Sequence, residues 1–421
     1  MIVLSGARIF DGHRFLDDHA VVVEGKRIAA IVRYADRPRG AARDLAGGLL
    51  APGYIDVQVN GAGGVLFNQD PTPEAIARIA TAHRNHGTVG LLPTLVTDTP
   101  QVMAAAIAAT REARLRTPAT LGIHLEGPFL DPRRKGAHEL NYIRDLAPDD
   151  IETIAAADCG AVMMTLAPNR VGVESIAELA RRGVLVSLGH SEASYEQARA
   201  AVQAGARAFT HLFNAMSAPI GREPGMVGAA LDLADAFVGI IADGRHVHEA
   251  NLRIAFGSKR HDRFMLITDS MPPTAGGPDQ FDLQGRRVTR VDGCLRLDDG
   301  TLAGSVLTMD DAVRYAVNVV GLDLGDALAM ASRVPATFLR RDNELGCIAP
   351  GHLASLVHLD DDLRVLETWI EGRPTTDGSI KSGEAAQLEP ASRPAALNPR
   401  SRRLLPPTSS NREYPDRDDD T

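Results

Sequence analysis

Cysteine is scarce in this 421-residue sequence, with three residues in all. Cys159, Cys294 and Cys347 are scattered along the chain and form no Cys-x-x-Cys pair. Small secreted proteins that depend on disulfides are dense in cysteine, so this odd and scattered set excludes a disulfide framework. We expect reduced thiols and a cytoplasmic protein.

Long apolar runs and an excess of positive charge are also missing. No apolar stretch approaches the length that crosses a bilayer, and the first residues lack the basic and apolar regions of a signal peptide. We therefore expect a soluble protein without a membrane partner. The 45 basic and 54 acidic residues give a net charge of −9, which argues against a nucleic-acid partner. A local basic pocket for a small anion stays possible.

A glycine-rich phosphate-binding loop is the third absence. An open, doubly wound α/β sheet needs Gly-x-Gly-x-x-Gly after its first strand, and Gly61-Ala-Gly-Gly64 does not match that pattern. No Gly-Lys-Ser/Thr occurs either. The open sheet is therefore the weaker of two α/β alternatives.

The sequence does have an alternation of apolar runs and helical patterns that begins at residue 52. Eight runs are candidate strands: Tyr54–Val59, Val89–Leu95, Leu121–Leu125, Ala161–Leu166, Val184–Leu188, Ala208–Thr210, Phe237–Ile241 and Phe264–Thr268. The helical patterns between them include Pro73–Asn85, Pro100–Arg114, Val173–Arg182, Ser194–Ala204 and His248–Gly257. Eight strands with helical crossovers predict an α/β fold with a (β/α)8 TIM-type barrel over residues 52–345.

Both ends of the chain carry short β-rich runs with no helix between them. We expect residues 1–51 and 346–380 to form one small, discontinuous β-sandwich domain. Phe281–Leu302 predicts a hairpin inserted beside the last barrel strand, and Thr308–Val320 and Gly325–Arg333 predict helices. Residues 381–421 are rich in proline, serine and arginine, so we expect a disordered tail.

Four of the expected strands end on a side chain that can bind a metal or transfer a proton. These are Glu126, His190, His211 and Asp269, and in a parallel barrel such strand ends meet at one mouth. Two histidines and one carboxylate are the ligand set of catalytic zinc, so Glu126, His190 and His211 predict a metal site. Asp269 would take a proton from water and return it to a leaving group, although a helix N-cap is an alternative role.

The first expected barrel strand places Gln58 and Asn60 on one face. Metal-dependent hydrolases of this architecture often have two histidines there, and amides are poor zinc ligands. We therefore predict one divalent metal ion per subunit, with zinc as the expected element. Gln58, Asn60 and His124, which precedes Glu126 on its strand, are expected to support the ligands from behind.

Nine segments, taken in chain order, carry a resemblance to a known family: Pro52–Gly64, His124–Leu130, Lys135-Gly-Ala-His138, Gly189-His-Ser191, Thr210-His-Leu-Phe-Asn-Ala-Met216, Gly221-Arg-Glu-Pro-Gly225, Ala242-Asp-Gly-Arg-His246, Thr268-Asp269 and Leu302-Ala-Gly-Ser305. Together they resemble the N-acetylglucosamine-6-phosphate deacetylases of the amidohydrolase superfamily. The resemblance runs from about residue 2 to 375 and leaves the tail outside.

The resemblance implies hydrolysis of the acetamide of N-acetylglucosamine 6-phosphate to glucosamine 6-phosphate and acetate, in amino-sugar catabolism and cell-wall recycling. By matching position, it implies the same three metal ligands, Asp269 as the acid/base and His138 as the group that polarises the amide carbonyl. It implies that the sugar phosphate is bound by Ala137, Asn214, Ala215, Arg222, His246, Leu302, Ala303 and Gly304. In this family a phosphate-binding residue can come from the neighbouring subunit, which implies a homodimer.

Three alternatives stay open. N-acetylgalactosamine 6-phosphate differs at one hydroxyl, and the motifs do not exclude its deacetylation. A dihydroorotase-like or dihydropyrimidinase-like ring opening is more distant, because those chains have His-x-His where this one has Gln58 and Asn60. A non-catalytic barrel that binds a sugar phosphate would be expected to lack the metal ligands or Asp269, and all of them are present.

Overall fold

The computed structural model of this protein describes residues 1–374, so the predicted disordered tail lies outside the described residues. Eight parallel strands form one sheet in the order in which they occur in the chain. They are β8 (Tyr54–Val59), β11 (Thr88–Val96), β12 (Gly122–Glu126), β13 (Ala161–Leu166), β14 (Leu185–Leu188), β15 (Ala208–Phe209), β16 (Phe237–Ile240) and β17 (Phe264–Leu266). Among the described residues, no helix is both long enough and apolar enough to span a membrane.

The first and last strands of this sheet meet and bring it close to a closed barrel. Val59 bridges Ser270 just beyond the end of β17, and the Asp269 N–H donates to the Gln58 carbonyl at 2.9 Å. The predicted (β/α)8 barrel is therefore confirmed. The last strand is shorter than predicted, because the chain leaves the regular ladder where the two edges join.

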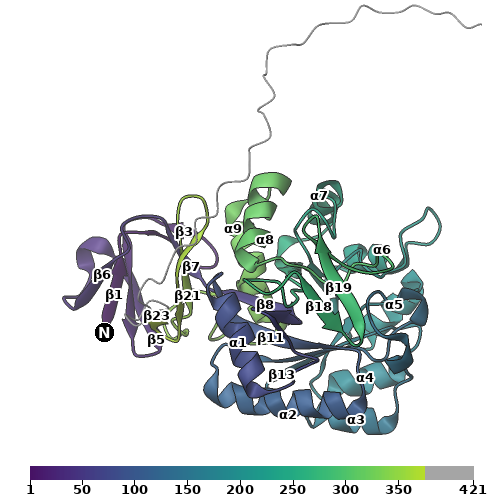
Figure 1. Cartoon of the computed structure of the whole chain (residues 1–421). Helices are drawn as coiled ribbons and strands as arrows, with labels where there is room; N and C mark the ends of the chain where they lie inside the picture. Colours follow the sequence, from purple (N-terminus) through teal and green to yellow (C-terminus); the bar gives the residue numbers. More distant parts are fainter. Residues whose placement is uncertain (375–421) are drawn as a thin grey trace, which may run out of the picture. The chain divides into compact units, whose positions relative to one another are not determined.

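Helices cover the outside of the barrel (Figure 1). They are α1 (Pro73–Arg84), α2 (Pro100–Arg116), α3 (Pro148–Ala155), α4 (Val173–Arg181), α5 (Tyr195–Gln203), α6 (Gly225–Asp232), α7 (Glu249–Ser258), α8 (Met309–Tyr315), α9 (Leu324–Ala331) and α10 (Arg333–Phe338). Local sequence sets several of their starts. The Thr72 hydroxyl accepts from the N–H of the third residue of α1, and Thr99 does the same for α2, each with proline at the first helical position.

The sequence patterns predict the long helices better than the short ones. Helices α3, α6 and α10, each of eight residues or fewer, are not among the predicted elements, whereas the equally short α8 and α9 lie within predicted helices. The expected helix over 308–320 passes into a π-turn at Ala316–Val320. The expected helix over 325–333 is interrupted at Ser332, where α9 ends and α10 begins.

Strands from both ends of the chain form two further sheets. One has the order β5-β4-β1-β6 and the other β23-β22-β21-β7-β2-β3. Their bounds are β1 (Ile2–Ser5), β2 (Arg8–Phe10), β3 (Phe15–Leu16), β4 (His19–Glu24), β5 (Arg27–Arg33), β6 (Ala41–Asp44), β7 (Leu49–Pro52), β21 (Leu356–Leu359), β22 (Val365–Ile370) and β23 (Arg373–Pro374). In Figure 1 the purple strands of the N-terminus and the yellow strands of the C-terminal part lie together, joined by the antiparallel β7–β21 pair.

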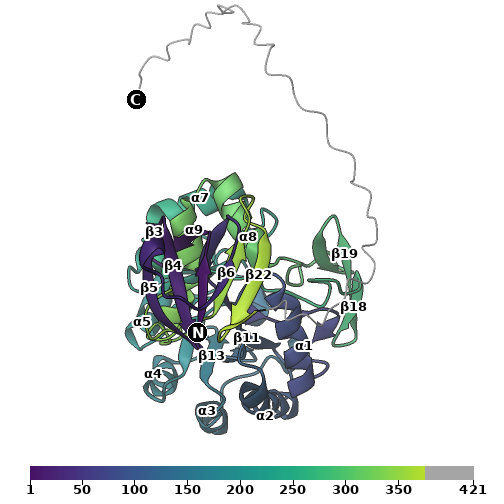
Figure 2. The same ribbon diagram turned by 90° about the vertical axis from the view of Figure 1, so that its left-hand side faces the viewer.

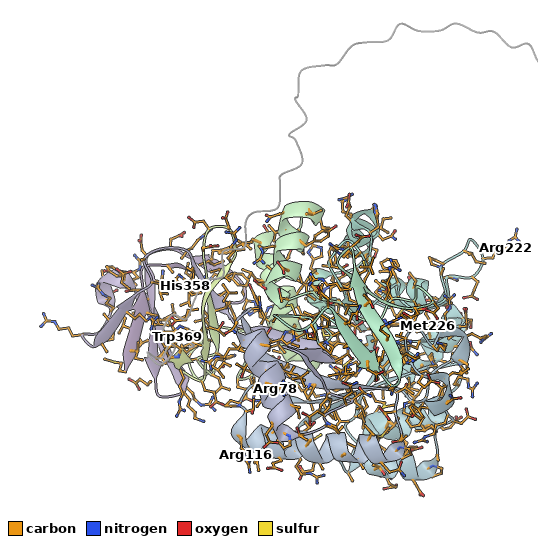
Figure 3. All side chains as sticks on the ribbon, in the orientation of Figure 1. Arg78, Arg116, Arg222, Met226, His358 and Trp369 are labelled. Carbon is orange, nitrogen blue, oxygen red and sulfur yellow. The ribbon has the colours of Figure 1, made fainter. Side chains whose placement is uncertain are left out.

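These two sheets enclose a core of their own. Its members include Leu4, Ile9, Val21, Leu50 and Leu356, and its largest side chain is the buried Trp369 (Figure 3). We therefore propose that residues 1–51 and 346–380 make up one sandwich domain and that residues 52–345 make up the barrel domain. Of the proposed sandwich, residues 375–380 lie outside the described part.

A three-stranded antiparallel sheet stands beside the barrel mouth, where the sequence predicts a hairpin. It consists of β18 (Gln280–Leu283), β19 (Arg286–Val291) and β20 (Cys294–Leu297), and Figure 2 shows β18 and β19 at one side of the barrel. Two side chains attach this sheet to the loops after β11 and β12. Gln284 donates to the Thr97 carbonyl at 2.7 Å, and Arg286 donates to the Ala137 carbonyl at 2.7 Å.

Candidate active site

Four side chains from the ends of separate strands meet at the floor of one cavity of about 380 Å³. Glu126 is the last residue of β12, His190 follows β14 by two residues, and His211 follows β15 by two residues. Asp269 lies at the junction of β17 and β8. A volume of this size suits a small-molecule ligand, and strand C-termini are the active-site end of such a barrel.

Three of these residues have a left-handed backbone. The φ angle is +48° at His190, +32° at His211 and +52° at Asp269. Residues with a Cβ seldom adopt such angles, and where they do the conformation costs energy that the surrounding structure must offset. Here it turns each side chain off the strand path and into the cavity.

Three donor atoms lie within contact distance of one another. Glu126 Oε1 is 3.0 Å from His211 Nε2 and 3.3 Å from His190 Nε2, and the two Nε2 atoms are 2.9 Å apart. Ligands of a tetrahedral zinc ion at about 2.0–2.1 Å are separated from each other by about 3.3 Å. The three atoms therefore have close to the spacing of one shared coordination shell.

The hydrogen bond of His190 leaves the lone pair of its Nε2 atom directed toward the shared coordination shell. Its Nδ1 is 2.9 Å from the Arg134 carbonyl, which can only accept, so Nδ1 carries the proton and Nε2 is free to bind a metal. The side chains of Glu126, His190 and His211 are all buried. Two imidazole Nε2 atoms 2.9 Å apart need a proton or a metal cation between their lone pairs, and with the Glu126 carboxylate beside them the donor set fits a metal ion.

The residues of this cluster shift one another's pKa values. Burial alone would raise the pKa of Glu126, but its close contacts with the imidazoles of His190 and His211 lower that pKa well below its usual value. Burial opposes protonation of His211, yet the hydrogen bond and charge of Glu126 raise the pKa of that imidazole. Glu126 is thus an ionised carboxylate, as a metal ligand must be.

His138 also approaches Glu126 and His190, and this trio is a second, overlapping candidate metal site. Its Nε2 is 4.0 Å from Glu126 Oε2, a longer contact than those of His211. Its Nδ1 accepts from the Thr97 N–H at 3.2 Å, so the proton of the neutral ring lies on Nε2. Burial and the charge of His190 lower the pKa of His138 well below its usual value. A neutral ring with Nε2–H in the cavity is a hydrogen-bond donor, so we favour His211 as the third ligand.

Amide side chains at the end of strand β8 and directly after it hold the carboxylates in place. Gln58 Nε2 donates to Glu126 at 2.9 Å and to Asp269 at 3.2 Å, and Asn60 Nδ2 donates to Asp269 at 2.6 Å. Burial and the neighbouring Glu126 charge raise the pKa of Asp269 to about 6. A carboxyl with such a pKa can accept and return a proton near neutral pH.

His124 lies beneath this layer, inside the barrel. Its Nε2 is 2.8 Å from the Thr165 hydroxyl and its Nδ1 is 3.3 Å from the Thr94 hydroxyl. Burial lowers the pKa of His124 to about 4, so the ring is neutral. His124 does not line the cavity; it packs behind Glu126, two residues earlier on the same strand.

Most of the residues expected to bind the sugar phosphate line the same cavity: Ala137, Asn214, Ala215, His246, Leu302 and Gly304. His246 Nδ1 is 2.7 Å from Asp243, while its buried Nε2 has no hydrogen-bond partner among residues 1–374. Burial opposes protonation of His246, but the hydrogen bond and charge of Asp243 raise the pKa of this imidazole.

Two expected residues do not reach the cavity. Ala303 is fully buried behind its neighbours, and its N–H donates to the Leu295 carbonyl at 3.0 Å. Arg222 is exposed on the loop before α6, and Figure 3 shows it at the tip of that loop, pointing away from the rest of the molecule. The prediction that Arg222 holds phosphate is not met within a single chain.

Two arginines that the sequence analysis did not select do line the cavity. Arg133 pairs with Asp131 at 2.8 Å, and Arg134 pairs with Glu192. The basic run Pro132-Arg-Arg-Lys135, which leads into the motif that ends at His138, is the signal that would have found them.

Comparison with known proteins gives the family that this chain matches. Residues 49–384 match the model of the amidohydrolase family, and residues 1–50 match the NagA composite domain. The chain is 41% identical over 379 residues to an N-acetylgalactosamine-6-phosphate deacetylase of Shewanella sp. (strain ANA-3), which covers 88% of this chain and 95% of that protein.

Two solved structures have the same fold along most of the chain. The N-acetylglucosamine-6-phosphate deacetylase of Pasteurella multocida superposes with a TM-score of 0.86 at 35% identity, over 89% of this chain and 99% of that one. An aspartate-to-alanine mutant of the Mycobacterium smegmatis N-acetyl-D-glucosamine-6-phosphate deacetylase, in complex with N-acetyl-D-glucosamine 6-phosphate, has a TM-score of 0.83 at 34% identity, over 89% and 98% of the two chains.

Proposed function

This chain belongs to the amidohydrolase family, and we propose that it hydrolyses N-acetyl-D-glucosamine 6-phosphate to D-glucosamine 6-phosphate and acetate. The observation that carries the proposal is the convergence of Glu126, His190 and His211 on one point, with Asp269 beside them. The likeness to deacetylases of N-acetylhexosamine 6-phosphates over most of the chain supports the choice of substrate.

A divalent ion held by Glu126, His190 and His211 would supply Lewis acidity, lowering the pKa of water and polarising a carbonyl. We propose zinc, because a carboxylate and two imidazoles with one open position are its usual catalytic ligand set. Since the three cysteines are free, we place the reaction in the reducing environment of the cytoplasm.

Asp269 and His138 would carry the proton transfers and the polar contact to the amide. Asp269 takes the proton of the attacking water and then gives it to the amine nitrogen as the C–N bond breaks. His138, neutral with Nε2–H in the cavity, donates to the acetamide oxygen as negative charge develops there. Gln58 and Asn60 fix the orientation of the Asp269 carboxylate during both transfers.

We propose that Asp243 keeps His246 protonated so that its Nε2–H can donate to the anionic substrate. Replacing Asp243 with asparagine removes that charge but keeps an oxygen that can accept from the Arg245 and His246 backbone N–H groups, both at 2.8 Å. We expect KM to rise roughly tenfold or more with a smaller change in kcat. In the wild type KM should increase as pH rises through the raised pKa of His246, and in the variant that increase should begin at lower pH.

Steady-state kinetics as a function of pH will test this role of Asp243. The matched control is Asp361→Asn, because Asp361 is an exposed aspartate in the sandwich. A variant whose KM and pH profile match those of the wild type would show that Asp243 serves only the local turn.

We propose that Arg222 completes the phosphate site of a second copy of this chain in a homodimer. Its exposure and its absence from the cavity of its own chain support an intermolecular role. Within one chain, Arg133 and Arg134 line the cavity and are already paired with carboxylates, which leaves their charges partly neutralised.

Acetate release from four substrates will test the function. Purified, metal-analysed protein should be incubated with N-acetylglucosamine 6-phosphate, N-acetylgalactosamine 6-phosphate and the two unphosphorylated sugars. We expect kcat/KM for the preferred phosphate to exceed that for its unphosphorylated form by at least about 10²-fold, because a site with fixed donors rejects a ligand that lacks the matching group. Absence of acetate from both phosphates would contradict the proposal.

The galacto epimer is the second candidate substrate. The Shewanella relative, 41% identical to this chain, is an N-acetylgalactosamine-6-phosphate deacetylase. The ratio of kcat/KM for the two phosphates in the same assay decides between the epimers.

A further inference from the structure

Three arginines meet at the opposite end of the barrel from the candidate active site. Arg207 directly precedes β15 and Arg263 directly precedes β17, so both lie at strand N-termini, while Arg340 lies two residues after the end of α10. All three line one open depression of about 680 Å³. The ring of Phe237 underlies two of them, with guanidinium carbons 5.8 Å (Arg207) and 5.1 Å (Arg263) from its centre.

These positive charges are poorly compensated within the described part of the chain. The side chains of Arg207 and Arg340 form no hydrogen bond or ion pair with any residue of 1–374. Arg263 has a contact of 3.5 Å with the Asp262 carboxylate and donates to the Asp262 carbonyl at 3.0 Å, but its Nε, like that of Arg207, is buried without a partner among residues 1–374. Arg182, which is also partly buried, contrasts with them because it is paired with both Glu152 and Glu178.

The local electrostatics show the same imbalance. Burial lowers the pKa of Arg207, and the charges of Arg340 and Arg263 lower it further. Asp235 also lines the depression, but it is exposed and no ion pair joins it to the three arginines. A partly desolvated guanidinium beside two like charges is stabilised by an anion.

We infer that this depression is a binding site for a small phosphate-bearing anion, separate from the active site. Guanidinium groups bind phosphate through paired N–H donors, and three that converge on one hollow can contact several oxygens of the same group. Because the chain as a whole carries a net charge of −9, the site favours a small phosphate ester over a large polyanion. A hollow of this size leaves room for an organic part beyond the phosphate.

Binding of inorganic phosphate and of glycerol 3-phosphate to the metal-loaded full-length protein will test the inference. Isothermal titration should be performed on the wild type, on an Arg207→Gln/Arg340→Asn double variant, and on an Arg116→Gln/Arg253→Gln control. Asparagine suits position 340 because the φ angle there is +58°. The control removes the same charge from exposed helical pairs with Glu112 and Glu249.

We expect the wild type and the control to bind anion at two places per chain, one of them the active site. The double variant should retain the active-site event and bind at least about tenfold more weakly at the other. The rise in Tm that glycerol 3-phosphate causes should shrink in the double variant and persist in the control. Acetate release without added anion should be unchanged in both, since none of these residues lines the active-site cavity.

Identical isotherms and identical Tm responses in the double variant and the control would overturn the inference, because anion binding would then be confined to the active site. If the double variant does not fold, the single Arg340→Asn variant replaces it. Arg340 is exposed and unpaired within residues 1–374, so its loss removes a like charge without opening the core. Unaltered anion binding by that variant would likewise overturn the inference.

Discussion

Replacing Asp269 with asparagine is expected to lower kcat roughly 10²- to 10⁴-fold while the protein keeps its metal ion. The new amide has the shape of the carboxylate, and its oxygen can still accept from Asn60 and Gln58, so the floor of the cavity is retained. What the variant loses is a group that takes a proton from water and returns it to the leaving amine. The measurements are kcat for acetate release and the metal content per chain.

Metal content separates two explanations for a loss of turnover in this variant. If Asp269 acts as the acid/base, the ion stays bound and only the rate falls. If the ion is lost together with activity, Asp269 serves mainly to hold the metal. Asp298→Asn, which changes an exposed aspartate in the turn after β20, controls for the loss of one negative charge. Near-normal turnover would contradict the assigned role.

The convergence of the site could be predicted from the sequence because the strands of a parallel barrel lie side by side in the order in which they occur in the chain. Strands β12, β14 and β15 are each followed by or end on one polar ligand, and the carboxyl ends of all strands meet at one mouth, so Glu126, His190 and His211 lie close together although 85 positions separate the first from the last. Asp269 follows the same rule at the closing strand. A pattern read along the chain therefore predicts proximity in space.

The division of roles among the histidines could not be predicted in the same way. His138 lies on a loop, and its tautomer depends on the Thr97 N–H, which comes from the loop after a different strand. His83 lies in a helical pattern, yet it is buried and its Nε2 is 3.0 Å from the hydroxyl of Ser270, next to Asp269. Contacts of this kind join segments whose separation in the sequence follows no period.

The positions of the cationic residues could not be predicted from the sequence either. The motif around Arg222 identifies a residue type suited to phosphate, but residue type does not reveal that this arginine is exposed on a loop outside the cavity of its own chain. Arg133 and Arg134 enter the cavity because Asp131 and Glu192 hold them there, and neither carboxylate belongs to an obvious motif. The three arginines at the opposite end of the barrel come together only through strand N-termini and the loop after α10.

Replacing His211 with asparagine is expected to weaken metal binding by more than about 100-fold. Loss of a residue that only hydrogen-bonds to a metal ligand weakens binding by roughly 10- to 100-fold, and loss of a ligand itself should cost more. Amides are poor zinc ligands, and the variant leaves only Glu126 and His190 in the cluster. Turnover should fall with the metal content. Dialysed protein should be analysed for bound metal, and Tm should be measured with and without added zinc, because an ion that binds only the folded state raises Tm.

The same measurements on His138→Asn decide between the two overlapping donor sets, which share Glu126 and His190. His138 accepts from the Thr97 N–H and directs Nε2–H into the cavity, so its loss should spare the ion and the zinc-dependent rise in Tm. It should lower kcat by about 10²- to 10³-fold, the effect of removing one donor to a developing oxyanion. If His138→Asn loses the ion and His211→Asn keeps it, the roles of the two histidines must be exchanged. The contacts of 2.9 and 3.0 Å made by His211 Nε2, against 4.0 Å for His138, predict the opposite outcome.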